Sequence, residues 1–153
     1  MTSPFLLSTW SFSEPILESE YPNLSAGCSA LDAVEACVRN AEQDESIDSV
    51  GFGGLPDRNG NCTFDAMVMT SPSSSGAVCG IERHLHPVSI ARLVMEKTNH
   101  TLLAGTLADD FADSHAMESA NILAHTSEQK WESWKKRSRD TKPLAPFDHG
   151  HGQ

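Results

Sequence analysis

DSVGFGGLPDRNGNCTFDAMVM, residues 48–69, is the stretch from which the other predicted elements can be placed. Glycine loses more backbone freedom on folding than any other residue, so Gly51 and Gly53 indicate a positive φ or a close neighbour of the backbone. The segment PDRNG predicts a turn, because Pro presets φ and Asn-Gly tolerates positive φ. Residues 62–69 predict a buried strand that carries one acid, Asp65. The stretch therefore predicts a glycine-lined loop, a turn and then a strand.

The composition limits the classes of partner. The chain has 153 residues, enough for one domain with a sizeable core. Its 11 basic and 21 acidic residues give a formal net charge of −10, which argues against nucleic acid or an anionic membrane surface, since both require a basic face. No run approaches the roughly 18 apolar residues of a membrane-spanning helix. Residues 1–4 lack the features of a secretory signal, so we expect a cytoplasmic chain or a numbering that omits a signal.

Periodicity and capping residues predict alternating helices and strands. Ser13 and Ser29 are predicted to cap two helices, the first of them broken at Tyr21-Pro22. Small residues at 76–81 predict that a neighbouring layer packs closely on that strand, and the short loop before it predicts an antiparallel pair. The predicted elements are a buried strand at 5–10, helices at 14–24 and 29–43, strands at 62–69 and 76–81, a helix at 87–97, a buried strand at 101–104, and helices at 106–114 and 128–137, the last capped by Ser127. Spacing alone indicates an α/β or α+β domain.

Cysteine, histidine and serine patterns identify no complete metal or catalytic site. The four cysteines lack zinc-site spacing and are interpreted as buried free thiols. His84 and His86, like His149 and His151, alternate as two ligands on one strand face would, but neither pair has an accompanying ligand set. Ser49 precedes glycines without forming the Gly-x-Ser-x-Gly elbow of a serine hydrolase. We predict no metal and no cofactor.

Several motifs, in order and with similar gaps, resemble the α subunit of the glycosylasparaginase family, whose members are N-terminal-nucleophile hydrolases. They are LSTWSF at 7–12, ALDAVE at 30–35, SVGFGGLPD at 49–57, FDAMVM at 64–69, VSIARLVMEKTNHT at 88–101 and LAG at 103–105. Motifs that keep their register from about residue 5 to about residue 137 are more specific than any one of them.

The resemblance implies an α+β fold, a four-layer αββα sandwich completed by a β chain cut from the same precursor. Residues 1–138 would form the α-subunit part of that single domain. The β chain would begin with a nucleophilic threonine whose own amine acts as the base, and it would carry the oxyanion-hole donors. The implied substrate is N4-(β-N-acetylglucosaminyl)-L-asparagine, cleaved at the amide between asparagine and sugar. This chain alone is expected to be inactive. The family further implies an (αβ)2 assembly and a lysosomal or exported location.

Three residues match substrate-site positions of the family. Trp10 matches the tryptophan that lines the substrate pocket, Phe12 the aromatic residue beside it, and Ser49 the serine near the nucleophile. From spacing alone, the interpretation of Trp10 and Phe12 as core aromatic residues is favoured. The resemblance also implies that the partner's threonine approaches the glycine loop after Ser49. Asp65, as a buried acid, must be hydrogen-bonded or paired and is interpreted as structural rather than catalytic.

Residues 139–153 are predicted to form a flexible tail leading to the self-cleavage site. The family ends its α chain in His-Asp directly before the threonine, where backbone strain assists the cut. Here the sequence reads His151-Gly152-Gln153, so either the cut follows Gln153 or the sequence stops short of an Asp-Thr pair. His151 and Gln153 are the candidate autoproteolysis residues.

Two alternatives remain open. An isoaspartyl peptidase/L-asparaginase of the same family shares the fold and the nucleophile, although the motifs containing Trp10 and Ser49 favour a glycosylasparaginase. The other alternative is a truncated, non-catalytic chain that acts as a binding or structural partner. It predicts no companion chain that begins with threonine.

Overall fold

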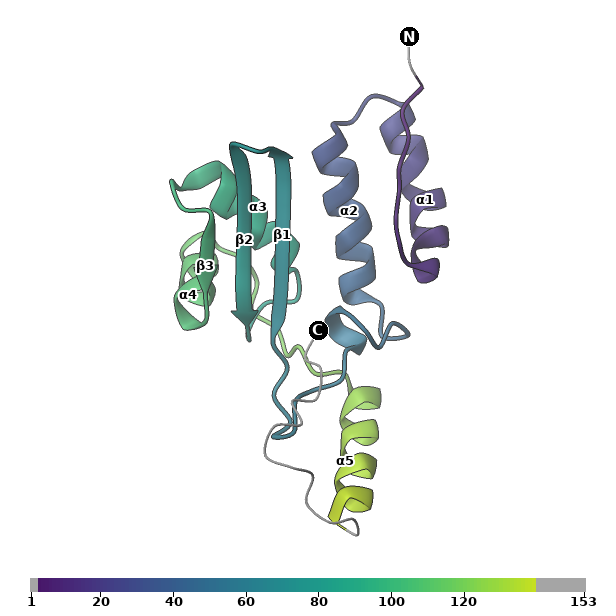
Figure 1. Cartoon of the computed structure of the whole chain (residues 1–153), viewed down its shortest axis with the longest axis vertical. Helices are drawn as coiled ribbons and strands as arrows, with labels where there is room; N and C mark the ends of the chain where they lie inside the picture. The colour runs from purple at the N-terminus through teal and green to yellow at the C-terminus, as the bar shows by residue number, and fades with distance from the viewer. Residues whose placement is uncertain (1–2, 140–153) are drawn as a thin grey trace.

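The computed structural model describes residues 3–139 and shows a mixed α and β fold (Figure 1). In chain order its elements are the 3-10 turn η1 (Ser11–Ser13), α1 (Glu14–Ser25), α2 (Ala30–Gln43), the 3-10 turn η2 (Gly51–Gly53), β1 (Phe64–Ser71), β2 (Ser74–Ile81), α3 (Pro87–Lys97), β3 (Leu102–Ala104), α4 (Thr106–Ser114) and α5 (His125–Arg139). Within the described residues, no helix is both long and apolar enough to cross a membrane.

The three strands form one sheet in the order β1-β2-β3. β1 and β2 pair antiparallel through a tight turn in which Ser71 lies opposite Ser74, which confirms the predicted hairpin. β3 runs parallel to β2, with Val78 opposite Leu103. α3 supplies the connection that a parallel pair requires.

The core lies between this sheet and the helices α3 and α4. Gly76 of β2 is buried so closely against α3 that a β-carbon there would lie 2.2 Å from the carbonyl oxygen of Ala91. This contact confirms the predicted close packing on β2. The core is built from buried aliphatic and aromatic side chains: Phe64, Val68, Val78, Ile81, Val88, Ile90, Ala91, Val94, Ala108, Ala112 and Ile122.

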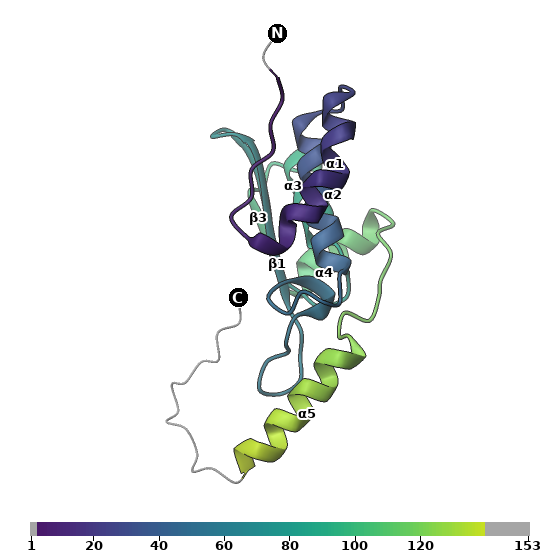
Figure 2. The ribbon, with the colours of Figure 1, turned by 90° about the vertical axis from the view of Figure 1, so that its right-hand side faces the viewer.

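The opposite face of the sheet is uncovered within the described residues. Figure 2 shows α3 and α4 on one side of the strands only. Met67 and Leu102 point to the open side and are 62% and 54% exposed. The prediction that residues 62–69 and 101–104 form buried strands is therefore wrong for one face of each. Strand side chains alternate between two faces, and only one face is packed here.

The N-terminal segment departs from the predicted strand. Residues 3–8 form no regular element, and Phe5 and Leu7 are 81% and 84% exposed. The prediction of a buried strand is wrong in this chain, because none of the described strands pairs with the segment. A strand needs a neighbour for its backbone hydrogen bonds.

The predicted starts of α1, α2 and α4 are confirmed, whereas the predicted break within α1 is wrong. Ser29 caps α2 by accepting a hydrogen bond from the backbone N–H of Asp32, at 3.0 Å. Ser13 lies at the N-cap position of α1, as predicted, but its hydroxyl donates to the carbonyl of Trp10 and makes no capping hydrogen bond. α1 continues through Pro22 to Ser25, so the predicted break at residues 21–22 is wrong. Pro22 lies in the last turn of this exposed helix, so water can bond the carbonyl that its missing N–H leaves unpaired. α4 begins directly after Gly105 as predicted.

Candidate active site

Trp10 and Phe12 stack on each other just before α1. Their ring centroids lie 5.7 Å apart with an interplanar angle of 24°. The η1 turn fixes this pair, because the backbone N–H and the hydroxyl of buried Ser13 both donate to the carbonyl oxygen of Trp10. Trp10 is 55% exposed and Phe12 is half-buried, so the pair forms an accessible apolar surface rather than part of the core.

The glycine loop lies at the same end of the α1–α2 helix pair. α1 begins and α2 ends at the lower end of the helix pair in Figure 1, which brings the aromatic pair before α1 near the loop that follows α2. Ser49 lies in this loop and is half-buried. Its hydroxyl makes no hydrogen bond within residues 3–139.

The loop is wound tightly on its own chain. Gly51 has a φ of +61°, and a β-carbon there would lie 2.2 Å from the carbonyl oxygen of Glu42. A β-carbon on Gly53 would lie 2.3 Å from the carbonyl oxygen of Ile47. The close neighbours of these two glycines are therefore residues of this chain. Packing within this chain therefore explains why glycine is needed at 51 and 53. The expected approach of a residue from a partner chain is not needed to explain them.

Glu42 holds one side of the loop. Its buried carboxylate accepts a 3.0 Å hydrogen bond from the backbone N–H of Val88, at the start of α3, and lies 3.2 Å from Nδ1 of His86. Burial raises the pKa of the Glu42 carboxyl, and the hydrogen bonds to His86 and Val88 offset part of that rise.

α5 holds the other side. The hydroxyl of Ser127 donates to the carbonyl oxygen of Gly53 at 2.8 Å. The prediction that Ser127 caps this helix is wrong, because α5 begins at His125 and Ser127 lies in its first turn. Further along, Trp131 packs on Gly60 and donates from Nε1 to the carbonyl oxygen of Arg58.

The turn at residues 56–60 forms as predicted. The Asp57 carboxylate accepts hydrogen bonds from the backbone N–H groups of Asn59 and Asn61, at 2.8 and 2.9 Å. Gly60 adopts a φ of +94°, and its lack of a side chain admits the Trp131 ring. This turn thereby provides the surface on which α5 packs.

Asp65 is exposed, which corrects the expectation of a buried acid. Its carboxylate accepts a 2.7 Å hydrogen bond from the backbone N–H of Gly80 on the neighbouring strand. A hydrogen bond from the Cys79 thiol to Asp65 raises the pKa of that thiol. The predicted structural interaction of Asp65 is present, on the open face of the sheet.

All four cysteines are free thiols, three of them half-buried and Cys79 exposed, so they are less buried than expected.

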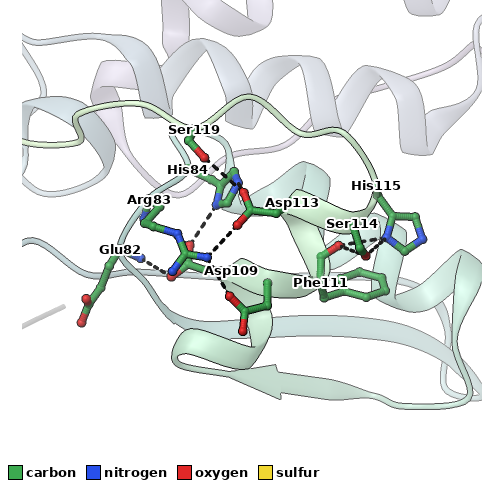
Figure 3. A network of polar contacts seen from close by, with 10 residues as sticks. Glu82, Arg83, His84, Asp109, Phe111, Asp113, Ser114, His115 and Ser119 are labelled. Atoms are coloured by element: carbon green, nitrogen blue, oxygen red, sulfur yellow. Dashed lines mark hydrogen bonds and ion pairs between the residues drawn. The ribbon is translucent and has the colours of Figure 1, made fainter.

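A second polar network joins the end of β2 to α4 (Figure 3). Buried Asp109 accepts from the backbone N–H groups of Glu82 and Arg83, both at 3.1 Å, and lies 2.9 Å from Nδ1 of His84. Asp113 binds Arg83 at 2.7 Å, and this ion pair lowers the pKa of the Asp113 carboxyl. The local sequence does not identify Asp109 as part of a network, because its only signal is an acid in the first turn of a helix.

The two alternating histidines have different partners. His84 faces Asp109 and Asp113, whereas His86 faces Glu42. They therefore do not form the ligand pair that an alternating strand would give. Among the described residues, no group of three or more His, Cys, Asp or Glu side chains is arranged to hold a metal ion. His149, His151 and Gln153 lie outside the described residues.

The chain is similar to asparaginases over most of its length. A family model described as asparaginase matches residues 8–147. The N(4)-(beta-N-acetylglucosaminyl)-L-asparaginase of Elizabethkingia miricola is 42% identical over 146 residues, which cover 95% of this chain and 43% of that protein. The Mus musculus protein of the same name is 38% identical over 136 residues, covering 88% of this chain and 39% of its own length. The chain thus spans about two fifths of the length of these relatives.

Proposed function

We propose that this chain, which belongs to the asparaginase family, supplies the α part of an amidohydrolase whose nucleophilic threonine begins a companion β chain. One observation carries the proposal: nearly the whole chain matches glycosylasparaginases, yet it spans only about two fifths of their length. The remainder of such a protein would supply the residues that perform the chemistry.

The open face of the sheet supports this division. Met67 and Leu102 are exposed apolar side chains on a sheet that is packed on its other face. In a four-layer αββα sandwich, a second sheet would cover them and would bury their apolar area. The companion β chain is the occupant we propose, and an (αβ)2 assembly would pair two such units.

The proposed reaction is hydrolysis of the amide between asparagine and N-acetylglucosamine. The threonine hydroxyl would attack the side-chain carbonyl carbon while the free amine of the same threonine takes the hydroxyl proton. The carbon–nitrogen bond then breaks, the glycosylamine leaves with a proton, and a β-aspartyl ester remains. Water hydrolyses that ester to aspartate and regenerates the threonine.

The residues of this chain would bind and orient rather than react. The exposed Trp10–Phe12 stack offers an apolar wall for the substrate, at the end of the α1–α2 helix pair where the glycine loop lies. Ser49 offers a hydroxyl with no hydrogen bond to the described residues, so that it can contact the threonine. His151 and Gln153 would lie next to the cleavage site that releases the threonine.

The test is turnover by the complete processed protein. We expect aspartate release from N4-(β-N-acetylglucosaminyl)-L-asparagine and at least about tenfold lower kcat/KM for isoaspartyl dipeptides, a discrimination of about 1.4 kcal/mol. Turnover of isoaspartyl dipeptides alone would replace this proposal with an isoaspartyl peptidase. Turnover of neither substrate would favour a non-catalytic chain.

Two variants test the binding role. Trp10→Ala should lower kcat/KM for the glycosylated substrate about tenfold or more, because it removes the larger ring of the stack. Trp134→Ala is the matched control, since Trp134 is also an exposed tryptophan but lies on α5. Equal losses in the two variants would contradict a substrate role for Trp10.

A further inference from the structure

We infer that Ser127 is a positioning residue for Ser49, acting through the carbonyl group of Gly53; the inference rests on the function proposed above. Ser127 lies in the first turn of α5, 74 positions after Gly53, so it is not part of the glycine loop that it would position. Its role would be to hold the loop that presents Ser49 to the threonine of the companion chain.

The hydrogen bond between Ser127 and Gly53 is buried. Ser127 is 1% exposed and its hydroxyl lies 2.8 Å from the carbonyl oxygen of Gly53. Removing the hydroxyl would leave that buried carbonyl without this donor, and an unsatisfied buried polar group costs more than a surface hydrogen bond. The bond therefore resists displacement of Gly53.

A displacement of Gly53 would also move the rest of the loop, because the loop is tightly packed. The backbone N–H of Gly54 donates to the carbonyl oxygen of Gly51 at 2.9 Å, which closes the η2 turn. Gly51 and Gly53 both lie against backbone atoms of residues 42–47, with no room for even a methyl group. Movement at Gly53 must therefore shift residues 42–54 together, and this segment contains Ser49.

Glu42 fixes the opposite side of the same loop. Its carboxylate is tied to the start of α3 through Val88 and His86, while its backbone packs on Gly51. The loop is thus held between α3 and α5. The Ser49 hydroxyl makes no hydrogen bond to the described residues, so these two attachments of the loop, rather than a side-chain hydrogen bond, set where Ser49 lies.

The experiment is a double-mutant cycle in the complete processed enzyme. Ser127→Ala should lower kcat for the glycosylated substrate about fivefold with KM changed less than about twofold, as loss of one net hydrogen bond predicts. Ser127→Thr, which keeps the hydroxyl, should restore most of the rate. Ser19→Ala is the matched control, because the Ser19 hydroxyl also bonds a backbone carbonyl, at 2.9 Å, but on the exposed surface of α1.

The cycle separates positioning from a purely structural effect. In a Ser49→Ala background, Ser127→Ala should cause little further loss, because the group it positions is already absent. An equal loss in both backgrounds would overturn the inference. So would a lower concentration of active sites with an unchanged kcat for each site.

A readout without catalysis separates this inference from the proposed function. Hydrogen exchange at the Gly54 amide, which closes the η2 turn, should be about fivefold or more faster in Ser127→Ala than in the unmodified protein. Faster exchange in Ser127→Ala, together with no substrate turnover by the unmodified enzyme, would support the role of the Ser127–Gly53 hydrogen bond in holding the loop. It would refute the proposed amidohydrolase function. Unchanged exchange would overturn the attachment whatever the activity.

Discussion

Gly51 lies against Glu42 so closely that a β-carbon on Gly51 would come within 2.2 Å of the Glu42 carbonyl oxygen and 2.4 Å of its α-carbon. Both contacts are with backbone atoms, which cannot rotate away as a side chain can. The end of α2 and the glycine loop therefore pack as one unit, and the position of Ser49 depends on that unit.

The first prediction concerns this contact. Gly51→Ala should destabilise the protein by about 3 kcal/mol or more, because the methyl group must displace backbone and the residue must keep a positive φ. Gly80→Ala is the control: Gly80 has a φ of +68°, similar to the +61° of Gly51, but its nearest neighbour lies at 3.7 Å. Chemical denaturation measures the free energy of unfolding of both variants. Equal losses in Gly51→Ala and Gly80→Ala would show that the contact with Glu42 does not determine the cost.

The second prediction concerns the buried carboxylate of Asp109. Asp109→Asn should cost about 2–3 kcal/mol, because two different oxygens of Asp109 accept from the backbone N–H groups of Glu82 and Arg83, and in Asn an NH2 group replaces one of them and faces an N–H donor. Asp110→Asn, one residue later, removes only an exposed ion pair with Arg83 and should change stability little. Thermal unfolding of the two variants checks the difference, and a similar midpoint for both would show that the network in Figure 3 is dispensable.

The third prediction is a pH dependence that comes from Glu42. Burial raises the folded-state pKa of this carboxyl above its ordinary value of 4.5, so the folded state holds the proton to higher pH than the unfolded state does. The contribution of the protonated Glu42 carboxyl to the free energy of unfolding is therefore complete below about pH 4.5. It declines as the pH rises through the raised folded-state pKa. Glu42→Gln, which stays neutral, should gain stability relative to the unmodified protein over that rise.

Urea denaturation between pH 4 and pH 7 measures this difference. We expect a change of about 1.4 kcal/mol for each unit by which the folded-state pKa is raised. Glu18→Gln, a change on the exposed surface of α1, serves as the control. Parallel stability curves for Glu42→Gln and the unmodified protein would show that burial does not govern the ionisation of Glu42.

The fourth prediction concerns the open face of the sheet. Met67→Glu should prevent association with the companion chain, because it would bury a charge between two sheets. Leu107→Glu is the control, since Leu107 is also exposed but lies on α4, on the packed side of the sheet. Co-purification of the companion with a tagged α chain is the measurement. Normal recovery with Met67→Glu would mean that this face is not the interface.

Local sequence patterns predicted most of the fold. The apolar periodicity and cap of α2, the proline at the start of α3, and the glycine before α4 are signals within a few residues of the elements they define. The hairpin and the close contact at Gly76 also follow from short motifs. The family resemblance predicted from the motifs is confirmed by the match over residues 8–147.

The errors concern features that depend on distant parts of the chain. Whether Asp65 is buried depends on what covers its face of the sheet. Whether residues 5–10 form a strand depends on a neighbouring strand to pair with. The local sequence around these residues contains neither kind of information. The hydrogen bond between Ser127 and Gly53 joins residues separated by 74 positions, whereas the residues next to Ser127 predict only a helix cap. The partners of Asp109 are likewise more than 20 positions away.

The central claim is that this chain is one part of a self-processed enzyme with a threonine nucleophile. Intact-mass measurement of the purified protein, expressed from its complete reading frame, tests it most directly. The account predicts two polypeptides, the second beginning with threonine, and the mass of the first would identify the cleaved bond. A single polypeptide with no threonine-initiated companion would contradict the claim.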